Sequence, residues 1–317
     1  VLHRAAPREA RIAATRVLNA VPARASAGLV ALRPGEPIAA EEALARADLA
    51  LYAAKGSERG GLVEYPTGDT EAAVRLRTRL AWGRRLHRAL EDDAFVLYAD
   101  PVVDLQTGVI DGVELQLHLH DGDEFVARDD YRAHALRNGL AGRLDRWLVA
   151  RAIAAAPALG DASIAIGVSG ATLADGAFAD EVARRLDDTA IDPARLVLAV
   201  ADAEPGAAAL AQRGVRFALD GYGSRRASPA VLRELPCTRI RLDAELASAG
   251  APVDQAIVRH AVALGTELGL DVAATGLDTA TDAARLRALG VRYGQGALFG
   301  GAQPLDELLG RLAQPAA

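Results

Sequence analysis

Sulfur is almost absent from this chain. Its 317 residues include one cysteine, Cys237, and no methionine. A single cysteine excludes an intrachain disulfide and a zinc site built from several cysteines, and it favours a reducing, cytoplasmic location. The chain also begins at Val1 rather than with a methionine, so we expect it to be a piece of a longer polypeptide.

Long apolar runs and strong charge are missing as well. We find no apolar run of about 18 residues and no signal peptide, so we expect no membrane span within the chain. The net charge is -6, with neither a block of like charges nor a basic stripe, which argues against nucleic acid as a partner. Aromatic residues make up only 4% of the chain and apolar residues 51%, so the core has to be aliphatic.

Periodicity and turn residues divide the chain into three predicted parts. Residues 1–65 are too short to close a good core alone. They alternate helix-like and strand-like stretches, which cover Arg8–Val21, Ala25–Leu32, Ala40–Lys55 and Gly61–Tyr65 in that order. Residues 66–94 carry leucines at near-helical spacing with arginines between them, which predicts a connecting helix. Residues 95–317 alternate strands and helices, which predicts an α/β fold of the (βα)8 barrel type. The competing doubly wound sheet is typically marked by a glycine-rich turn after an early strand, and we find none.

The strands of this barrel are predicted from short apolar stretches that lie between helical ones, of which one covers Ala227–Glu234. They cover Phe95–Ala99, Val109–Leu119, Ala162–Ser169, Leu196–Ala201, Val215–Asp220, Thr238–Leu242, Asp271–Thr275 and a short stretch near Tyr293.

Five ordered segments of residues 95–317 carry a family pattern. They are FVLYADPVVDLQTGVIDGVEL (Phe95–Leu115), GLAGRLDRWLVARA (Gly139–Ala152), RFALDGYGSRRASPAVLRELPCTRIRLD (Arg216–Asp243), LGLDVAATGLDT (Leu268–Thr279) and YGQGALFGGAQP (Tyr293–Pro304). In this order and spacing they resemble the EAL family of cyclic di-GMP phosphodiesterases. The resemblance implies an EAL-type (βα)8 TIM-like barrel whose site lies at the C-terminal ends of its strands.

Two earlier segments carry a second pattern. SAGLVAL (Ser26–Leu32) and EEALARADLALYAAKGSERGGLVEY (Glu41–Tyr65) resemble the end of a GGDEF diguanylate cyclase domain. This resemblance implies that residues 1–65 are the C-terminal remnant of a partial α/β GGDEF-like domain. The half that would hold the G-G-D-E-F turn and the GTP site is not in the sequence, so we expect no cyclase activity.

The resemblance assigns the candidate site residue by residue. EAL enzymes are similar to two-metal phosphodiesterases, in which two divalent cations activate a water and stabilise the charge of the transition state. Glu114 and Asp220 keep metal-ligand positions, and Gln295 keeps a ligand-binding position. Arg241 stands for a lysine and Asp278 for a glutamate, and both are residual catalytic candidates. Oxygen ligands of the family are lost at Gly167, Ala199, Gly221 and Thr275.

The positions that would grip the ligand also differ from the family pattern. His118 stands for an arginine, and Asp100 stands for a glutamine. Strand alternation places Glu114, Gln116 and His118 on one face. Gln116, His118, Arg241 and Gln295 are therefore the candidate ligand-binding residues.

These residues predict a degenerate, non-catalytic GGDEF–EAL module of cyclic di-GMP signalling, because too few hard oxygen donors are left for two metal ions. It would bind protein partners or the nucleotide and need no cofactor, with Mg²⁺ or Mn²⁺ required only for residual activity. The resemblance also suggests a homodimer. One alternative is an active phosphodiesterase giving linear pGpG. Another is a barrel that binds a different small ligand through Gln116, His118 and Arg241.

Overall fold

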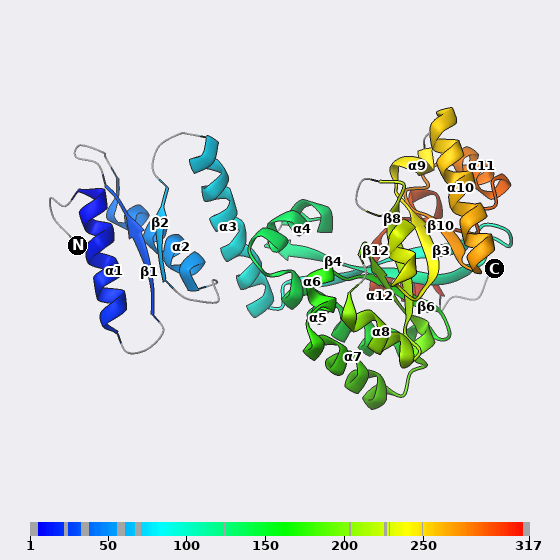
Figure 1. Cartoon of the computed structure of the whole chain (residues 1–317), viewed down its shortest axis with the longest axis horizontal. Coiled ribbons are helices and arrows are strands. Elements are labelled where there is room, and N and C mark those ends of the chain that lie inside the picture. The colour runs from blue at the N-terminus through cyan, green and yellow to red at the C-terminus, as the bar shows by residue number, and fades with distance from the viewer. Residues whose placement is uncertain are drawn as a thin grey trace. The chain divides into compact units, whose positions relative to one another are not determined.

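The computed structural model describes residues 6–21, 25–32, 38–55, 61–66, 71–122, 124–202, 204–224, 227, 229–248 and 250–312 (Figure 1). It separates into two compact units, Val1–Phe95 with Leu119–Ala141, and Val96–His118 with Gly142–Ala317. The division of the sequence into parts 1–65, 66–94 and 95–317 stays a prediction. Within the described ranges, no helix has the length and apolar character that a membrane crossing requires.

The first unit begins with two helix–strand pairs, and their bounds follow the predicted ones closely. Its elements are α1 (Pro7–Ala20), β1 (Ser26–Val30), α2 (Ala40–Lys55) and β2 (Gly61–Tyr65). Strands β1 and β2 pair in parallel, from Ser26 opposite Gly61 to Val30 opposite Tyr65.

Helix α2 lies directly against β1, and one glycine allows this. A Cβ atom on Gly28 would stand 2.2 Å from the carbonyl oxygen of Ala47 and 2.3 Å from the amide nitrogen of Leu51. Real Cβ atoms do not approach backbone so closely, so any side chain at position 28 would push α2 away from the strand. Ala50, Tyr65 and Leu80 form the small buried core beside this contact.

Helix α3 (Glu71–Glu91) lies within the stretch 66–94 that was predicted to be helical, and it belongs to the first unit. It packs against α2 and against α4 (Arg128–Arg137), which follows the short strand β5 (Glu124–Val126). The Trp82 ring stacks on His134 with 4.8 Å between ring centroids. Neither α4 nor β5 was predicted.

The second unit contains a closed barrel. In the described part of the chain, eight strands form the ring, in the order β3, β11, β10, β9, β8, β7, β6, β4 and back to β3. Their bounds are β3 (Phe95–Asp104), β4 (Ile110–Asp121), β6 (Ser163–Gly167), β7 (Leu196–Val200), β8 (Arg216–Tyr222), β9 (Cys237–Leu242), β10 (Asp271–Ala274) and β11 (Tyr293–Gly294). Strand β12 (Gln303–Pro304) pairs with β3 beside the ring.

The first strand of the ring departs from the predicted (βα)8 pattern. The other seven strands of the ring pair in parallel with one another. Strand β3 instead pairs antiparallel with β11, and it continues into β4 through a hairpin rather than a helix. The turn explains this connection. The Asp104 carboxylate accepts hydrogen bonds from the Gln106 and Thr107 amides at 2.8 and 3.1 Å, and Gly108 has a φ of +74°. The barrel therefore has one antiparallel strand, which opens it as part of a hairpin.

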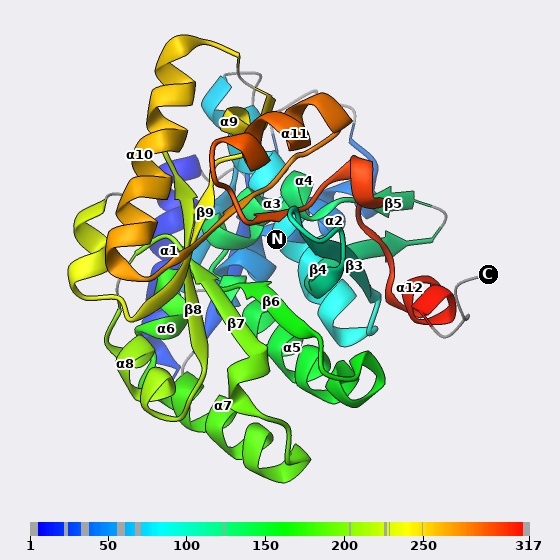
Figure 2. The same cartoon turned by 90° about the vertical axis from the view of Figure 1, so that its right-hand side faces the viewer.

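Helices between the later strands surround the barrel (Figure 2). The longer ones are α5 (Ala141–Ala155), α7 (Gly176–Thr189), α8 (Pro205–Gln212), α10 (Pro252–Leu268), α11 (Ala280–Ala288) and α12 (Leu305–Leu312). Short turns of helix are α6 (Gly170–Leu173), α9 (Glu245–Ser248), and the 3₁₀ segments η1 (Ala156–Leu159), η2 (Pro193–Arg195), η3 (Pro229–Arg233) and η4 (Ala297–Phe299). A helix predicted over Ala227–Glu234 is described only as the 3₁₀ segment η3.

The barrel core is aliphatic, as the composition predicted. All residues of β7 are buried, and a small cluster inside the barrel consists of Ala165, Val197, Ala199 and Ala218. Small side chains at these positions leave room for the long polar side chains that other strands contribute.

Candidate ligand site at the mouth of the barrel

The polar centre of the second unit is built from strand residues that face the barrel interior. Glu114 comes from β4, Asp100 from β3 and Asp220 from β8, while Arg241 is the penultimate residue of β9 and Gln295 directly follows β11. Residues at the C-terminal ends of parallel strands meet at one mouth of a barrel. All five of these side chains were candidates or noted changes from the sequence alone, and the structure brings them together.

Arg241 lies at the centre of this group. Its Nη2 donates to Glu114 Oε2 at 2.8 Å, and its Nε lies 3.5 Å from Asp220 Oδ1. Gln295 Nε2 donates to the same Glu114 oxygen at 2.5 Å and to Asp100 Oδ2 at 3.3 Å. The Glu114 carboxylate on β4 therefore joins β9, through Arg241, to the segment after β11, through Gln295.

Most of this network is removed from water. The exposed fractions are 2% for Glu114, 6% for Arg241 and Gln295, and 7% for Asp100. Burial alone would lower the pKa of Arg241, but the charges of Glu114, Asp220 and Asp100 and the hydrogen bond to Glu114 outweigh it and raise that pKa above its usual value. Arg241 is thus a permanent cation inside the mouth.

His118 and Gln116 lie beside this network on β4. The His118 ring is 7% exposed and stacks on Tyr98 with 4.2 Å between centroids and 26° between planes. Gln116 is half-buried. Alternation along β4 is confirmed, since Leu115, Leu117 and Leu119 are buried on the opposite face.

The donor set does not fit a pair of Mg²⁺ or Mn²⁺ ions. Across the ranges that the structure describes, no group of three or more His, Cys, Asp or Glu side chains is arranged to hold a metal ion. Glu114 and Asp220, the two metal candidates, both contact the Arg241 guanidinium. Such ions prefer several oxygen ligands, and a cation already occupies the space between these two carboxylates.

The backbone at the changed positions also matters. Gly221 has a φ of +76°, a left-handed conformation that glycine adopts freely and other residues rarely adopt. A Cβ atom at Gly167, the last residue of β6, would meet nothing within 4 Å. A side chain at position 167 would therefore have open space, whereas a carboxylate at position 221 would require a strained backbone.

Asp278, the other catalytic candidate, is not joined to the network. It is exposed, and its Oδ1 accepts a hydrogen bond from the Ala297 amide at 3.4 Å. Thr279, not Asp278, caps helix α11 by accepting from the Asp282 amide. Among the described residues we find no hydrogen bond or ion pair from Asp278 to Glu114 or Arg241, so the structure does not bring the two catalytic candidates together.

A second charged layer was not found from the sequence. Arg239 lies two residues before Arg241 on β9, places its guanidinium 3.9 Å from the centre of the Tyr293 ring, and contacts Asp111 at 3.4 Å. Burial lowers the pKa of Arg239, although Tyr293 and Asp111 oppose this. The sequence could have indicated Arg239, because residues two apart on a strand share a face and Arg241 was already a candidate site residue on this strand.

The chain matches the family described as EAL domain over residues 83–302. The chain belongs to the EAL domain family.

Curated relatives agree with this assignment. The bifunctional diguanylate cyclase/cyclic di-GMP phosphodiesterase MucR of Pseudomonas aeruginosa is 28% identical over 301 residues, covering 90% of this chain and 44% of MucR. Protein Rv1354c of Mycobacterium tuberculosis is 31% identical over 292 residues, covering 86% of this chain and 46% of Rv1354c. The chain thus spans less than half the length of these relatives.

Solved structures confirm the fold. The MucR phosphodiesterase in complex with c-di-GMP superposes with a TM-score of 0.65 at 26% identity, covering 72% of this chain and 99% of that one. The EAL domain of Xanthomonas citri FimX in complex with c-diGMP has a TM-score of 0.65 at 22% identity, covering 73% and 97%. The second likeness concerns the fold alone.

Proposed function

We propose that this chain is a non-catalytic EAL module of cyclic di-GMP signalling that acts by binding a protein partner or, less favourably, the nucleotide. The observation that carries the proposal is the position of Arg241. Its guanidinium lies 2.8 Å from Glu114 and 3.5 Å from Asp220, the two carboxylates kept at metal-ligand positions.

Electrostatics supports this choice. Two unit charges about 4 Å apart interact by about 4 kcal/mol at the effective dielectric constant of a protein. A divalent cation beside the Arg241 guanidinium would be repelled by about twice that amount. Gly167 and Ala199 supply no oxygen to compensate, so the two-ion arrangement that a metal-dependent phosphodiesterase needs is disfavoured at this mouth.

The first 65 residues fit the remnant of a GGDEF-like domain in this proposal. The alignment with MucR covers 90% of the chain, so it extends into residues 1–65, and MucR is named as a diguanylate cyclase as well as a phosphodiesterase. The motif glycine at Gly28 is also the residue on which the approach of α2 to β1 depends. We assign these residues a structural or partner-binding role.

An active phosphodiesterase is the second candidate, and the names of the relatives favour it. MucR and PA2567 of Pseudomonas aeruginosa are both named as cyclic di-GMP phosphodiesterases. For this chain to share that activity, Arg241 would have to leave the two carboxylates when metal binds.

Turnover of cyclic di-GMP tests the proposal directly. The purified chain is incubated with cyclic di-GMP and Mg²⁺ or Mn²⁺, and linear pGpG is separated by ion-exchange chromatography, with MucR as the positive control. We expect no product above the blank. Titration calorimetry then distinguishes a nucleotide receptor, which binds cyclic di-GMP, from a module that acts only through proteins. Metal-dependent product that disappears in a Glu114→Gln variant would show that the mouth is an active site.

A further inference from the structure

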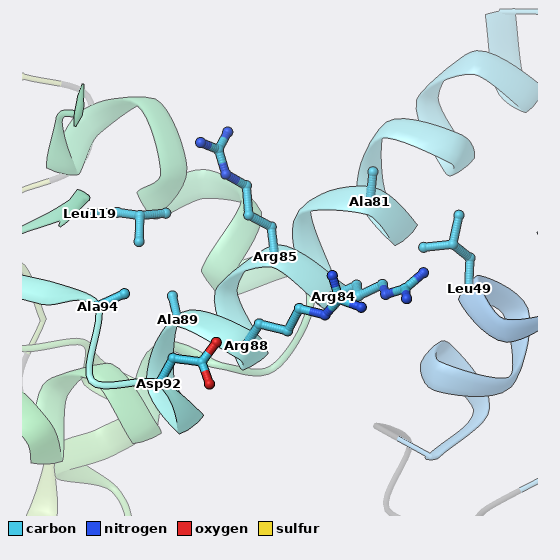
Figure 3. A pocket seen from close by; sticks show the side chains of 9 residues that line it. All are labelled: Leu49, Ala81, Arg84, Arg85, Arg88, Ala89, Asp92, Ala94 and Leu119. Atoms are coloured by element: carbon cyan, nitrogen blue, oxygen red, sulfur yellow. The ribbon is translucent and has the colours of Figure 1, made fainter. Parts of the chain in front are cut away.

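The first unit contains a basic pocket that the functional site does not explain. Its volume is about 430 Å³, and it lies along helix α3 (Figure 3). Three arginines, Arg84, Arg85 and Arg88, line it together with a single carboxylate, Asp92. Pockets that bind small molecules in proteins typically have volumes of about 300–1,000 Å³, so the size suits a small organic ligand.

The basic residues are concentrated here against the charge of the whole chain. The chain carries a net charge of -6, with 36 basic residues among 317. Helix α3 nevertheless has arginines at six of its 21 positions and acidic residues only at its two ends. A locally positive pocket on an acidic protein attracts anions and does little to attract the long polyanion of nucleic acid.

Two of the arginines form ion pairs with surface carboxylates, and Arg85 also lies over the Trp82 ring. Arg84 Nη2 lies 3.2 Å from Asp48, and Arg85 Nη2 lies 2.7 Å from Glu124. The carboxylate side chains are 55% and 66% exposed, whereas those of Arg84 and Arg85 are 27% and 24% exposed. Ion pairs with such exposed carboxylates contribute little, so a stronger anion can replace them without a large cost.

Arg88 is the third arginine, and it pairs with no carboxylate among the residues that the structure describes. Arg84 and Arg88 stand four residues apart, and their side chains extend to the same side of α3 in Figure 3, while Arg85 points to the other side. Guanidinium groups are planar forks that match the oxygens of a phosphate. Arg84 and Arg88 can therefore contact one phosphate from neighbouring turns.

The rest of the lining is apolar. Leu49, Ala81, Ala89 and Leu119 contribute methyl groups, and none of them offers a polar side chain. A bare inorganic anion would make no use of this surface. A ligand with a phosphate at one end and a flat, largely apolar ring at the other would use both parts, because rings pack on methyl groups and on guanidinium planes.

We propose that this pocket binds a mononucleotide, with Arg84 and Arg88 on its phosphate and the base against the apolar wall. The pocket is built entirely within the first unit, from α2, α3 and the segments around Ala94 and Leu119. It therefore lies outside the barrel mouth, and its occupation does not depend on whether the mouth binds cyclic di-GMP.

Calorimetry of the whole chain with 5′-GMP and 5′-AMP in about 150 mM KCl tests this proposal, with inorganic phosphate as a separate titrant. We expect a mononucleotide to bind at least about tenfold more tightly than phosphate, because phosphate lacks the ring. An Arg88→Gln variant should weaken nucleotide binding by about tenfold or more, since it removes one charged hydrogen-bond donor.

The matched control is Arg75→Gln. Arg75 is on the same helix, is 66% exposed, pairs with Glu71, and does not line the pocket. The Arg75→Gln variant loses the same charge from the same helix, so we expect its affinity for nucleotide to stay within about twofold of that of the unchanged chain. Three results would each overturn the proposal: absence of binding, equal weakening by both variants, or binding that Arg88→Gln leaves intact, which would place the nucleotide elsewhere. Circular dichroism confirms that both variants fold.

Discussion

Removing the charge of Arg241 should destabilise the barrel strongly. Arg241→Met keeps an unbranched side chain of similar length but removes the 2.8 Å hydrogen bond to Glu114 and the contact with Asp220. Glu114 and Asp100, only 2% and 7% exposed, then lose their nearest cation. Breaking a buried ion pair by removing one partner costs about 3–5 kcal/mol. We therefore expect the free energy of unfolding of the barrel to fall by about 4 kcal/mol.

A double variant separates the charge effect from packing. Arg241→Met combined with Glu114→Gln removes both charges, and such neutral replacements of buried pairs are often close to neutral in stability. We expect the double variant to be more stable than Arg241→Met alone, with a coupling energy of about 3 kcal/mol between the two positions. Arg292→Met is the matched control, because Arg292 pairs with Asp271 at 2.8 Å but is 52% exposed. It should cost less than about 1 kcal/mol.

The two tryptophans allow the barrel to be observed separately in this experiment. Trp82 lies on α3 of the first unit and Trp147 on α5 of the second, and the chain has no other tryptophan. Two units need not unfold together, so urea unfolding is followed by Trp147 fluorescence in a Trp82→Phe background. A loss below about 1 kcal/mol for Arg241→Met, or single effects that simply add in the double variant, would refute the buried ion-pair network.

Two further predictions concern single residues. Burial raises the pKa of the Cys237 thiol from 9.0 to about 12. At pH 8 the native chain should therefore react with iodoacetamide roughly 1,000-fold more slowly than the chain in urea, and its rate should increase as the pH rises. Mass spectrometry measures both rates, and equal rates would contradict the prediction. Gly28→Ala should destabilise the first unit by about 3 kcal/mol, because the added methyl group meets backbone atoms of α2. Hydrogen exchange of α2 measures the loss, and Gly176→Ala, whose methyl group meets nothing within 4 Å, is the control that should show none.

Local sequence signals predicted the regular elements well where they were strong. The bounds of α2 and β2 agree with the prediction at both ends, because apolar spacing and turn residues coincide there. Helix α4 was missed because its sequence, RDDYRAHALR, is mostly polar and buries only Tyr131 and Ala135. The prediction of a full helix over Ala227–Glu234 was too long, because the short segment between Pro229 and Pro236 has little room for helical hydrogen bonds.

The candidate site could be predicted as a set of residues but not as a set of contacts. Strand alternation and the family pattern identified Glu114, Arg241 and Gln295. Their hydrogen bonds join positions 127 and 181 residues apart, and no local pattern determines which donor reaches which acceptor. In the structure the Asp100 carboxylate accepts a hydrogen bond from Gln295, 195 residues away in the sequence.

The basic pocket was missed for a related reason. The sequence has no continuous block of positive charge, because leucine, alanine and tryptophan separate the arginines of α3. Helical geometry brings Arg84 and Arg88 onto one face, and tertiary packing then adds Leu49 and Leu119 from other segments. The helical spacing of Arg84 and Arg88 can be found in the sequence, whereas the packing of Leu49 and Leu119 beside them cannot.

The sign of the charge at the mouth helps to decide between the two binding roles in our proposal. Asp100, Glu114 and Asp220 carry three formal negative charges against the single positive charge of Arg241, so the mouth has a formal charge of about -2. Each phosphate of a cyclic dinucleotide placed about 6 Å from one unit of that excess would be repelled by about 3 kcal/mol at an effective dielectric constant of about 20. This net charge already includes Arg241, whose guanidinium contacts Glu114 and Asp220. We infer that the mouth favours a basic partner surface over an anionic nucleotide.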